Sequence, residues 1–152
     1  MCGIVGYIGP KAAAPVLLEG LKRLEYRGYD SAGVALLDSD GLKVVKRAGK
    51  LGVLEAALGA FPLNCGCGIG HTRWATHGAP TQPNAHPHTS RAGDIAMVHN
   101  GIFENAESIR AQLLAEGFAF VSETDTEVIV HLIDHLWVDG DPMEDAVAAA
   151  LR

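Results

Sequence analysis

The chain has 152 residues, a length that suits one domain with a core of its own. Its net charge is −6 and it contains no basic stripe, which argues against nucleic acid as a partner. It contains no apolar run near the ~20 residues that a membrane-spanning helix needs and no secretion-like N-terminal segment. Its three cysteines cannot all pair within the chain, so we expect free thiols and a cytoplasmic protein.

The first third of the chain alternates between strand and helix patterns. Residues 4–8 predict a short buried strand, and residues 12–24 predict a helix because their apolar side chains recur at helical spacing. Residues 25–33 are polar, aromatic and glycine-rich, which predicts a loop that holds large side chains in place. An Asp-Gly step then predicts a hairpin between strands at residues 34–37 and 42–47.

The middle of the chain is rich in glycine and proline. Residues 52–58 predict a short helix and residues 65–71 a strand. Residues 79–93 contain three prolines and no periodicity, so we expect a long ordered loop or lid in which His86-Pro87-His88 shapes the backbone. Residues 95–98 predict another buried strand.

Three helical patterns close the chain. We expect Asn105 to cap a helix that ends before Gly117. Thr124 and Glu127 have capping-box spacing and precede a second apolar stripe. The third helix is predicted at residues 142–151, after an Asp141 cap. We find no repeat or linker, so residues 1–152 are interpreted as part of one domain.

Cys2 is a candidate nucleophile at the front of the first predicted strand. Its small side chain favours removal of Met1 by an aminopeptidase, which would leave a thiol and a free α-amine on one residue. An α-amino group is partly unprotonated at neutral pH and can accept the thiol proton. The alternative is an ordinary small residue at a frayed terminus.

Four further residues could complete a site for an amide substrate. Asn100 and Gly101 follow a predicted strand and could donate two N–H groups to an oxyanion, although Asn-Gly is also a common turn. Arg73 could bind a carboxylate through its guanidinium group, or it could stack on Trp74. Asp125 could receive an ammonium group, or cap its helix. A site with one cationic and one anionic side chain would suit a zwitterionic amino acid.

Metal-ligand patterns in the sequence are weak. Glu127, His131 and His135 share a predicted helix face but lack the HExxH arrangement, so a solvated helix face is the better interpretation. Cys65 and Cys67 would lie on opposite faces of a strand. We therefore expect no metal and no cofactor.

Six sequence blocks together resemble the class II glutamine amidotransferases, which are N-terminal nucleophile hydrolases. The blocks are MCGIVGYIG at the start, EYRGYDSAG from Glu25, GHTRWATHG from Gly70, NAHPH from Asn84, VHNGIFEN from Val98 and SETDTEVI from Ser122. The last five look most similar to the branch that aminates fructose 6-phosphate. The alternatives are another branch, such as the amidophosphoribosyltransferases, and a non-catalytic glutamine-binding domain.

The resemblance implies a fold, a reaction and partners. The implied fold is an α/β four-layer αββα sandwich, of which residues 1–152 would be the N-terminal part. The implied reaction releases ammonia from L-glutamine, and sugar isomerase domains beyond this part would use it to aminate fructose 6-phosphate. It implies neither a cofactor nor a metal, and we expect a homo-oligomer in the full-length enzyme.

The resemblance also implies individual residue roles. Cys2 would be the nucleophile, and Asn100 and Gly101 the oxyanion hole. Arg73 would bind the glutamine carboxylate and Asp125 its amino group. Trp74, Thr76 and His77 would close over glutamine. Arg27 would help to order the site near Cys2.

Overall fold

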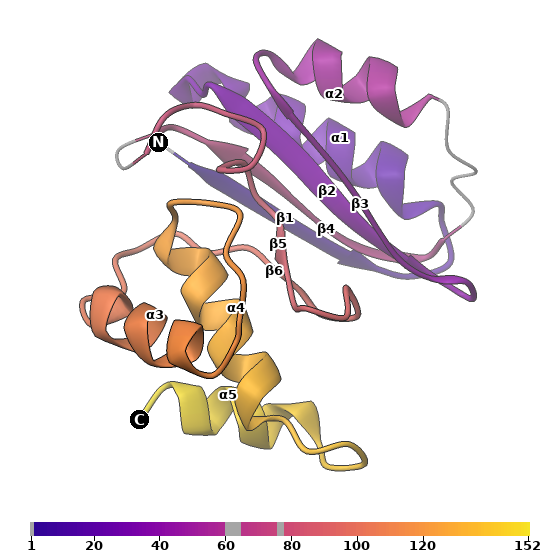
Figure 1. The fold of residues 1–152 in the computed structure, drawn as a ribbon. Helices are drawn as coiled ribbons and strands as arrows, with labels where there is room; N and C mark the ends of the chain where they lie inside the picture. Colours follow the sequence, from indigo (N-terminus) through magenta and orange to yellow (C-terminus); the bar gives the residue numbers. More distant parts are fainter. Residues whose placement is uncertain (1, 60–64, 76–77) are drawn as a thin grey trace.

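A four-stranded antiparallel sheet with two helices on one face forms the first half of the molecule (Figure 1). The computed structural model describes residues 2–59, 65–75 and 78–152, apart from the side chain of Arg27. The strand order is β1-β4-β2-β3. The strands are β1 (Gly3–Ile8), β2 (Ser31–Asp38), β3 (Gly41–Ala48) and β4 (Cys67–Arg73). The two helices are α1 (Ala13–Leu24) and α2 (Leu51–Leu58), and a short 3₁₀ turn, η1 (Glu25–Arg27), follows α1.

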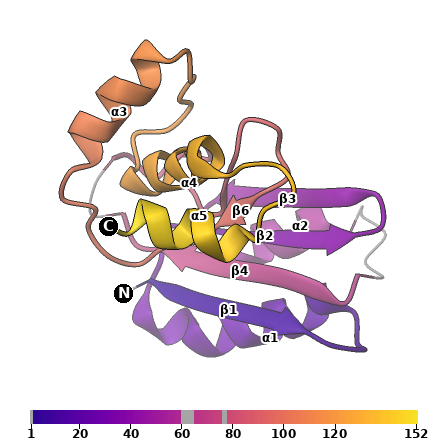
Figure 2. The same ribbon diagram turned by 90° about the horizontal axis from the view of Figure 1, so that it is seen from below.

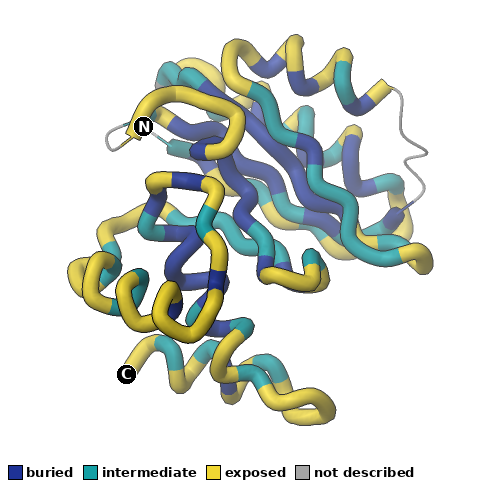
Figure 3. Tube along the Cα trace, viewed as in Figure 1, coloured by how far each residue is buried: buried dark blue, intermediate teal, exposed yellow. Residues whose placement is uncertain are grey.

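The main core lies between this sheet and the two helices. Leucines at helical spacing on α1 and α2 meet branched side chains from β2 and β3: Leu17, Leu21, Leu51, Leu54, Leu58, Val34, Leu36 and Val45. Burying one such side chain stabilises a fold by roughly 1.5–3 kcal/mol. The helical faces turned away from the sheet are exposed (Figure 3).

The second half of the chain packs on the other side of the sheet (Figures 1 and 2). It consists of the two-stranded ladder β5 (His88–Thr89) and β6 (Ala96–Met97) and three helices, α3 (Ala106–Ala115), α4 (Asp125–Leu136) and α5 (Met143–Ala150). α4 packs against β5 and β6 and contacts both other helices. The layers therefore run helix, sheet, sheet, helix, which confirms the predicted αββα order, with a second sheet of two short strands in the described part.

A glycine on β2 allows the two halves to approach closely. A Cβ atom at Gly33 would lie 2.2 Å from the backbone oxygen of His86, a distance that real side chains do not reach. The loop that leads into β5 therefore rests directly on the backbone of β2. This contact holds the second half of the chain against the first at His86, which lines the cleft between them.

Most predicted elements are present, but the bounds of several strands differ. Residues 31–33 begin β2 instead of ending the predicted loop, and β4 begins at Cys67 and ends at Arg73. Within the predicted loop 79–93, His88 and Thr89 form β5. The predicted strand at residues 95–98 is only two residues long and half-buried, because it pairs with β5 alone.

The first strand was predicted to be buried, and this is wrong for one of its faces. Val5 and Tyr7 pack towards the main core, whereas Ile4 is 43% and Ile8 84% exposed. The reason is position: β1 is an edge strand of the sheet, and α1 packs against only one of its faces. Among the described residues, no helix is long and apolar enough to cross a membrane.

One of the three predicted caps is confirmed together with its side-chain hydrogen bond. Thr124 caps α4, since its side chain accepts a hydrogen bond from the Glu127 N–H. Asn105 occupies the predicted cap position of α3, but its side chain makes no cap hydrogen bond there. The Asp141 cap was predicted wrongly, because the cap position of α5 is Pro142. The Glu127 carboxylate does not reach back to Thr124, because it accepts instead from the N–H groups of Val121 and Ser122.

Candidate active site

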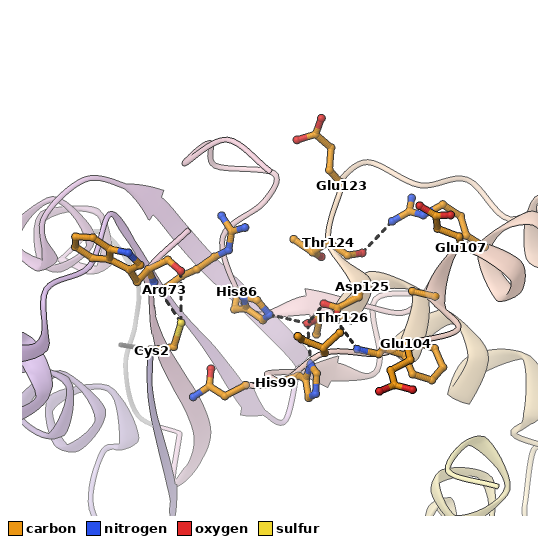
Figure 4. Close-up of a pocket in the computed structure, with 17 residues that line it drawn as sticks. Cys2, Arg73, His86, His99, Glu104, Glu107, Glu123, Thr124, Asp125 and Thr126 are labelled. Carbon is orange, nitrogen blue, oxygen red and sulfur yellow. Dashed lines mark hydrogen bonds between the residues drawn. The ribbon is translucent and has the colours of Figure 1, made fainter. Parts of the chain in front are cut away.

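A cleft of about 950 Å³ separates the end of the four-stranded sheet from the start of α4. Six of the nine predicted site residues line it: Cys2, Arg73, Trp74, Asn100, Gly101 and Asp125. In Figure 4, Cys2 and Arg73 belong to the wall formed by the sheet, whereas Asp125 and Thr126 belong to the opposite wall. The fold thus brings together residues that are up to 123 positions apart in the sequence.

Cys2 is held beside Trp74 by the pairing of two strands. Gly3 of β1 lies opposite Thr72 of β4, so the residues just beyond this pair meet at the end of the sheet. The Trp74 N–H donates to Sγ of Cys2 at 3.3 Å, and the thiol lies 3.7 Å from the Trp74 oxygen. The sulfur is therefore fixed by backbone atoms at the mouth of the cleft.

Asn100 is tied to a buried histidine on the central strand. Its Oδ1 lies 2.8 Å from Nε2 of His71, whose side chain is fully buried on β4. Burial lowers the pKa of His71 to about 4, with a further contribution from Arg73 against the opposing effect of the Asn100 hydrogen bond. His71 is consequently neutral at physiological pH.

Gly101 is needed because the His99 ring leaves no room for a side chain. A Cβ atom at this position would lie 2.7 Å from Nε2 of His99. The Nδ1 atom of His99 in turn lies 3.5 Å from Oγ1 of Thr126. Gly101 is exposed and lines the cleft, with the His99 ring beside it.

Two groups of opposite charge occupy the two walls of the cleft. Arg73 is the last residue of β4 and is 5% exposed; its Nη1 lies 3.4 Å from the Ala79 oxygen. Asp125 is the first residue of α4, and its Oδ2 accepts the Phe103 N–H at 2.9 Å. The arrangement presents a cation and an anion to one cavity, which suits a ligand that carries both an anionic and a cationic group.

A row of buried histidine rings supports the Asp125 wall. The rings of His71 and His86 lie 4.2 Å apart, and those of His86 and His88 lie 4.8 Å apart. Nε2 of His86 lies 2.9 Å from the Thr126 hydroxyl, and Nε2 of His88 lies 2.9 Å from that of Thr124. These two hydrogen bonds hold the residues on both sides of Asp125.

Both loop histidines of this row are neutral. Burial holds the pKa of His86 far below its usual range, and burial followed by the charge of Lys46 lowers the pKa of His88 to about 3. The prediction that His86-Pro87-His88 shapes the loop is consistent with these contacts. Because these rings are neutral, they place no positive charge next to Asp125.

Comparison with known proteins identifies the family. Residues 56–141, more than half of the chain, match the glutamine amidotransferase domain. The chain belongs to this family. Over all 152 residues, the glutamine amidotransferase domain is 60% identical to the glutamine–fructose-6-phosphate aminotransferase (isomerizing) of Thermus thermophilus. It is 54% identical over 157 aligned positions to the enzyme of the same name from Chlorobaculum tepidum. In both cases it spans 25% of the relative's length.

Solved structures share the fold of this glutamine amidotransferase domain. One is described as the allosteric regulatory enzyme of purine biosynthesis, with a TM-score of 0.83 and 28% identity over 99% of this chain and 32% of that one. Another is the glutamine phosphoribosylpyrophosphate amidotransferase of B. subtilis, with a TM-score of 0.80, 28% identity and the same two coverages. The predicted N-terminal nucleophile hydrolase fold is confirmed by this similarity.

The structure leaves three predicted site residues of the amidotransferase domain undescribed. Thr76 and His77 lie outside the described residues, and for Arg27 only the backbone is described, at the end of η1. Their predicted roles stay predictions.

The interpretation of Glu127 and His131 as part of a solvated helix face is wrong. Glu127 is 3% and His131 4% exposed, because the segment after α3 covers them: the rings of Phe118 and Phe120 lie 5.5 and 5.0 Å from the His131 ring. Only His135 faces solvent, where it pairs with Glu116. In the described part of the chain, no group of three His, Cys, Asp or Glu residues could hold a metal ion.

Sequence reasoning missed the residues that support the site of the amidotransferase domain. His71 and Thr126 were not considered, although both contact residues around predicted site positions. A signal for His71 was present, because residues two apart on a strand share a face and Arg73 follows it at that spacing. For Thr126 we find no comparable signal, since its partner is 40 residues away.

Proposed function

We propose that the full-length protein hydrolyses L-glutamine to glutamate and ammonia through a γ-glutamyl thioester on Cys2. The observation that carries this proposal is the shared cleft: a cysteine, an Asn-Gly pair and two side chains of opposite charge line one cavity. Glutamine has the matching groups, namely a carboxamide, a carboxylate and an ammonium. Membership of the glutamine amidotransferase domain family supports the same substrate.

The chemistry requires one nucleophile, one base and one anion site. After removal of Met1, the free α-amine of Cys2 accepts the thiol proton, and Sγ attacks the carboxamide carbon of glutamine. The carbonyl oxygen becomes an oxyanion that accepts N–H groups from the Asn100 side chain and the Gly101 backbone. The amine returns its proton to the departing nitrogen, which leaves as ammonia. Water then attacks the thioester, releases glutamate and restores the thiol.

The two charged anchors orient the substrate for this attack. The Arg73 guanidinium pairs with the α-carboxylate, and Asp125 pairs with the α-ammonium. Because the anchors lie on opposite walls, both can engage one amino acid while its side chain extends towards Cys2 (Figure 4). Holding the carboxamide near Sγ makes the attack effectively intramolecular.

We propose that the released ammonia aminates fructose 6-phosphate in the part of the protein outside this chain. The 60% identical relative is named for that reaction, and the chain corresponds to a quarter of its length. Assaying fructose 6-phosphate against phosphoribosyl pyrophosphate as acceptor tests this step. A preference for the second acceptor would assign the protein to the other branch.

The glutaminase proposal is tested with a pair of cysteine variants of the full-length protein. Cys2→Ala should abolish glutamine hydrolysis, and intact mass should show that Met1 has been removed from the active wild type. Cys67→Ala is the matched control, since Cys67 is also a partly exposed free cysteine but lies at the start of β4. Equal rates for Cys2→Ala and wild type would refute the proposed nucleophile.

We also propose that the full-length protein is a cytoplasmic homo-oligomer. The three cysteines are free thiols, which fits a reducing compartment. Cell fractionation tests the first part of this proposal and light scattering of the full-length protein tests the second.

A further inference from the structure

We propose that His71 is a positioning residue that fixes which end of the Asn100 amide faces the substrate. The inference rests on the proposed glutaminase activity, in which Asn100 donates to an oxyanion. It assigns a task to a buried histidine that lies behind the cleft and is not among the residues that line it.

The contact between the two residues leaves two possible arrangements. An asparagine amide has an acceptor end, Oδ1, and a donor end, Nδ2, and either could face the ring nitrogen of His71. If Oδ1 faces His71, the donor end is directed to the cleft. If the amide is flipped, an acceptor faces the cleft and would repel an oxyanion. Catalysis therefore depends on which nitrogen of His71 carries the proton.

The surroundings of His71 decide the position of that proton. The ring is neutral, so only one nitrogen has a hydrogen. Nδ1 is buried and has no hydrogen-bond partner among the described residues, whereas Nε2 faces Asn100. In proteins, a buried N–H group without a hydrogen-bond acceptor is rarer than a buried acceptor without a donor. The proton consequently belongs on Nε2, which donates to Oδ1 and leaves Nδ2 for the oxyanion.

The ring of His71 is also buried and held between fixed neighbours. β4 is hydrogen-bonded on both sides, with Ile4 of β1 and Gly33 of β2 paired to His71. The His86 ring packs against it at 4.2 Å. Because its own backbone and its stacking partner are both fixed, His71 presents Nε2 to Asn100 before substrate arrives.

The test is a double-mutant cycle on glutamine hydrolysis in the full-length protein. His71→Phe keeps a ring but removes the donor, and we expect kcat to fall about 10- to 100-fold while KM changes less than about twofold. In an Asn100→Ala background the same substitution should change kcat less than about twofold, because there is no amide left to orient. His71→Leu removes the donor without adding volume and should show the same coupling.

His88→Phe is the matched control. His88 is equally buried and bonds to a hydroxyl through Nε2, but its partner is Thr124 and not Asn100. Its effect on kcat should therefore be the same with and without Asn100→Ala. Equal effects of His71→Phe, or of His71→Leu, in the two backgrounds would overturn the inference. A wild type no more active than Cys2→Ala would instead refute the proposed function.

Discussion

Asp125 at the start of α4 holds the backbone N–H of Phe103 at 2.9 Å from its Oδ2. Phe103 lies two residues after Gly101, so this hydrogen bond ties the segment of the two proposed oxyanion donors to the helix that begins with the proposed ammonium anchor. The carboxylate has two separable tasks: it accepts a hydrogen bond, and it supplies negative charge to the cleft.

Asp125→Asn separates these two tasks. The amide oxygen of asparagine can still accept the Phe103 N–H, but the negative charge is lost. We expect KM for glutamine to rise about 10- to 100-fold with a small change in kcat, since a hydrogen bond to a charged group contributes about 1.5–3 kcal/mol. Asp125→Ala removes both tasks, so kcat should fall as well. Steady-state glutaminase kinetics measure both constants.

Glu104→Gln provides the control for the charge of Asp125. Glu104 lines the same cleft and is exposed, so removing its charge tests whether any nearby anion matters. KM should stay within about twofold of wild type. A rise in KM equal to that of Asp125→Asn would contradict a specific ammonium site at Asp125.

Gly101→Ala should lower kcat by displacing an oxyanion donor. The new Cβ would lie 2.7 Å from the His99 ring, so either the ring or the Gly101 backbone must move. Loss of one such donor typically costs about 2.7–4 kcal/mol of transition-state stabilisation, and we expect kcat to fall about 100-fold with little change in KM. Gly52→Ala is the control, because nothing lies within 4 Å of a Cβ at that position. Similar kcat values for the two variants would contradict the steric argument.

The sequence alone could locate six residues that line the cleft but not the residues that hold them in place. Cys2 precedes β1, Arg73 ends β4 and Asn100 follows β6. Strand ends are local features that periodicity reveals. The pairing of His71 with Asn100 joins residues 29 positions apart, and that of His86 with Thr126 joins residues 40 apart. Such contacts depend on how the two sheets face each other, which no local pattern specifies.

The wrong predictions about the fold have the same origin, namely contacts between distant residues. The apolar run of β1 predicted a buried strand, yet Ile8 is exposed because strand order and not composition makes β1 an edge. The spacing of Glu127 and His131 is compatible with a solvated helix face, and only the packing of Phe118 against α4 reveals that they are buried. Helix positions, in contrast, depend on local spacing and were predicted to within a few residues.

Glu127 should stabilise the domain at neutral pH and cease to do so in acid. Burial raises its pKa, but the His131 ring, the Ser122 hydroxyl and the N–H groups of Val121 and Ser122 together lower it to about 2. Its ordinary value is 4.5. Because the folded pKa is depressed, the stabilisation is complete above about pH 4.5 and is lost as pH falls towards about 2.

Glu127→Gln should therefore lower the free energy of unfolding by about 3 kcal/mol at pH 7. The difference from wild type should shrink between pH 4.5 and pH 2.5, where the wild-type carboxylate is progressively protonated in the unfolded chain. Urea unfolding followed across this range measures both quantities. Glu144→Gln, at an exposed position on α5, should shift the unfolding free energy by less than about 0.5 kcal/mol. A constant Glu127→Gln difference at every pH would contradict the argument.

The buried histidine row predicts a second loss of stability at milder acidity. The pKa of His88 is lowered to about 3 and that of His71 to about 4, from an ordinary value of 6.5. In the unfolded chain these rings take up protons as pH falls below about 6.5, whereas in the folded state they do not. Stability is thus complete above that pH and decreases below it, by up to about 1.4 kcal/mol per pH unit for each ring.

From pH 7 to pH 5.5, the free energy of unfolding should fall by roughly 1 kcal/mol for each buried ring, because that ring is protonated only in the unfolded chain. His88→Gln keeps a polar side chain next to Thr124 but cannot be protonated. The free energy of unfolding of this variant should therefore fall less than that of wild type over the same interval, by roughly 1 kcal/mol. His135→Gln is the control, because His135 is 40% exposed and pairs with Glu116 at the surface. If the His88→Gln and wild-type curves were parallel from pH 7 to pH 5.5, the neutral state of His88 in the folded protein would be contradicted.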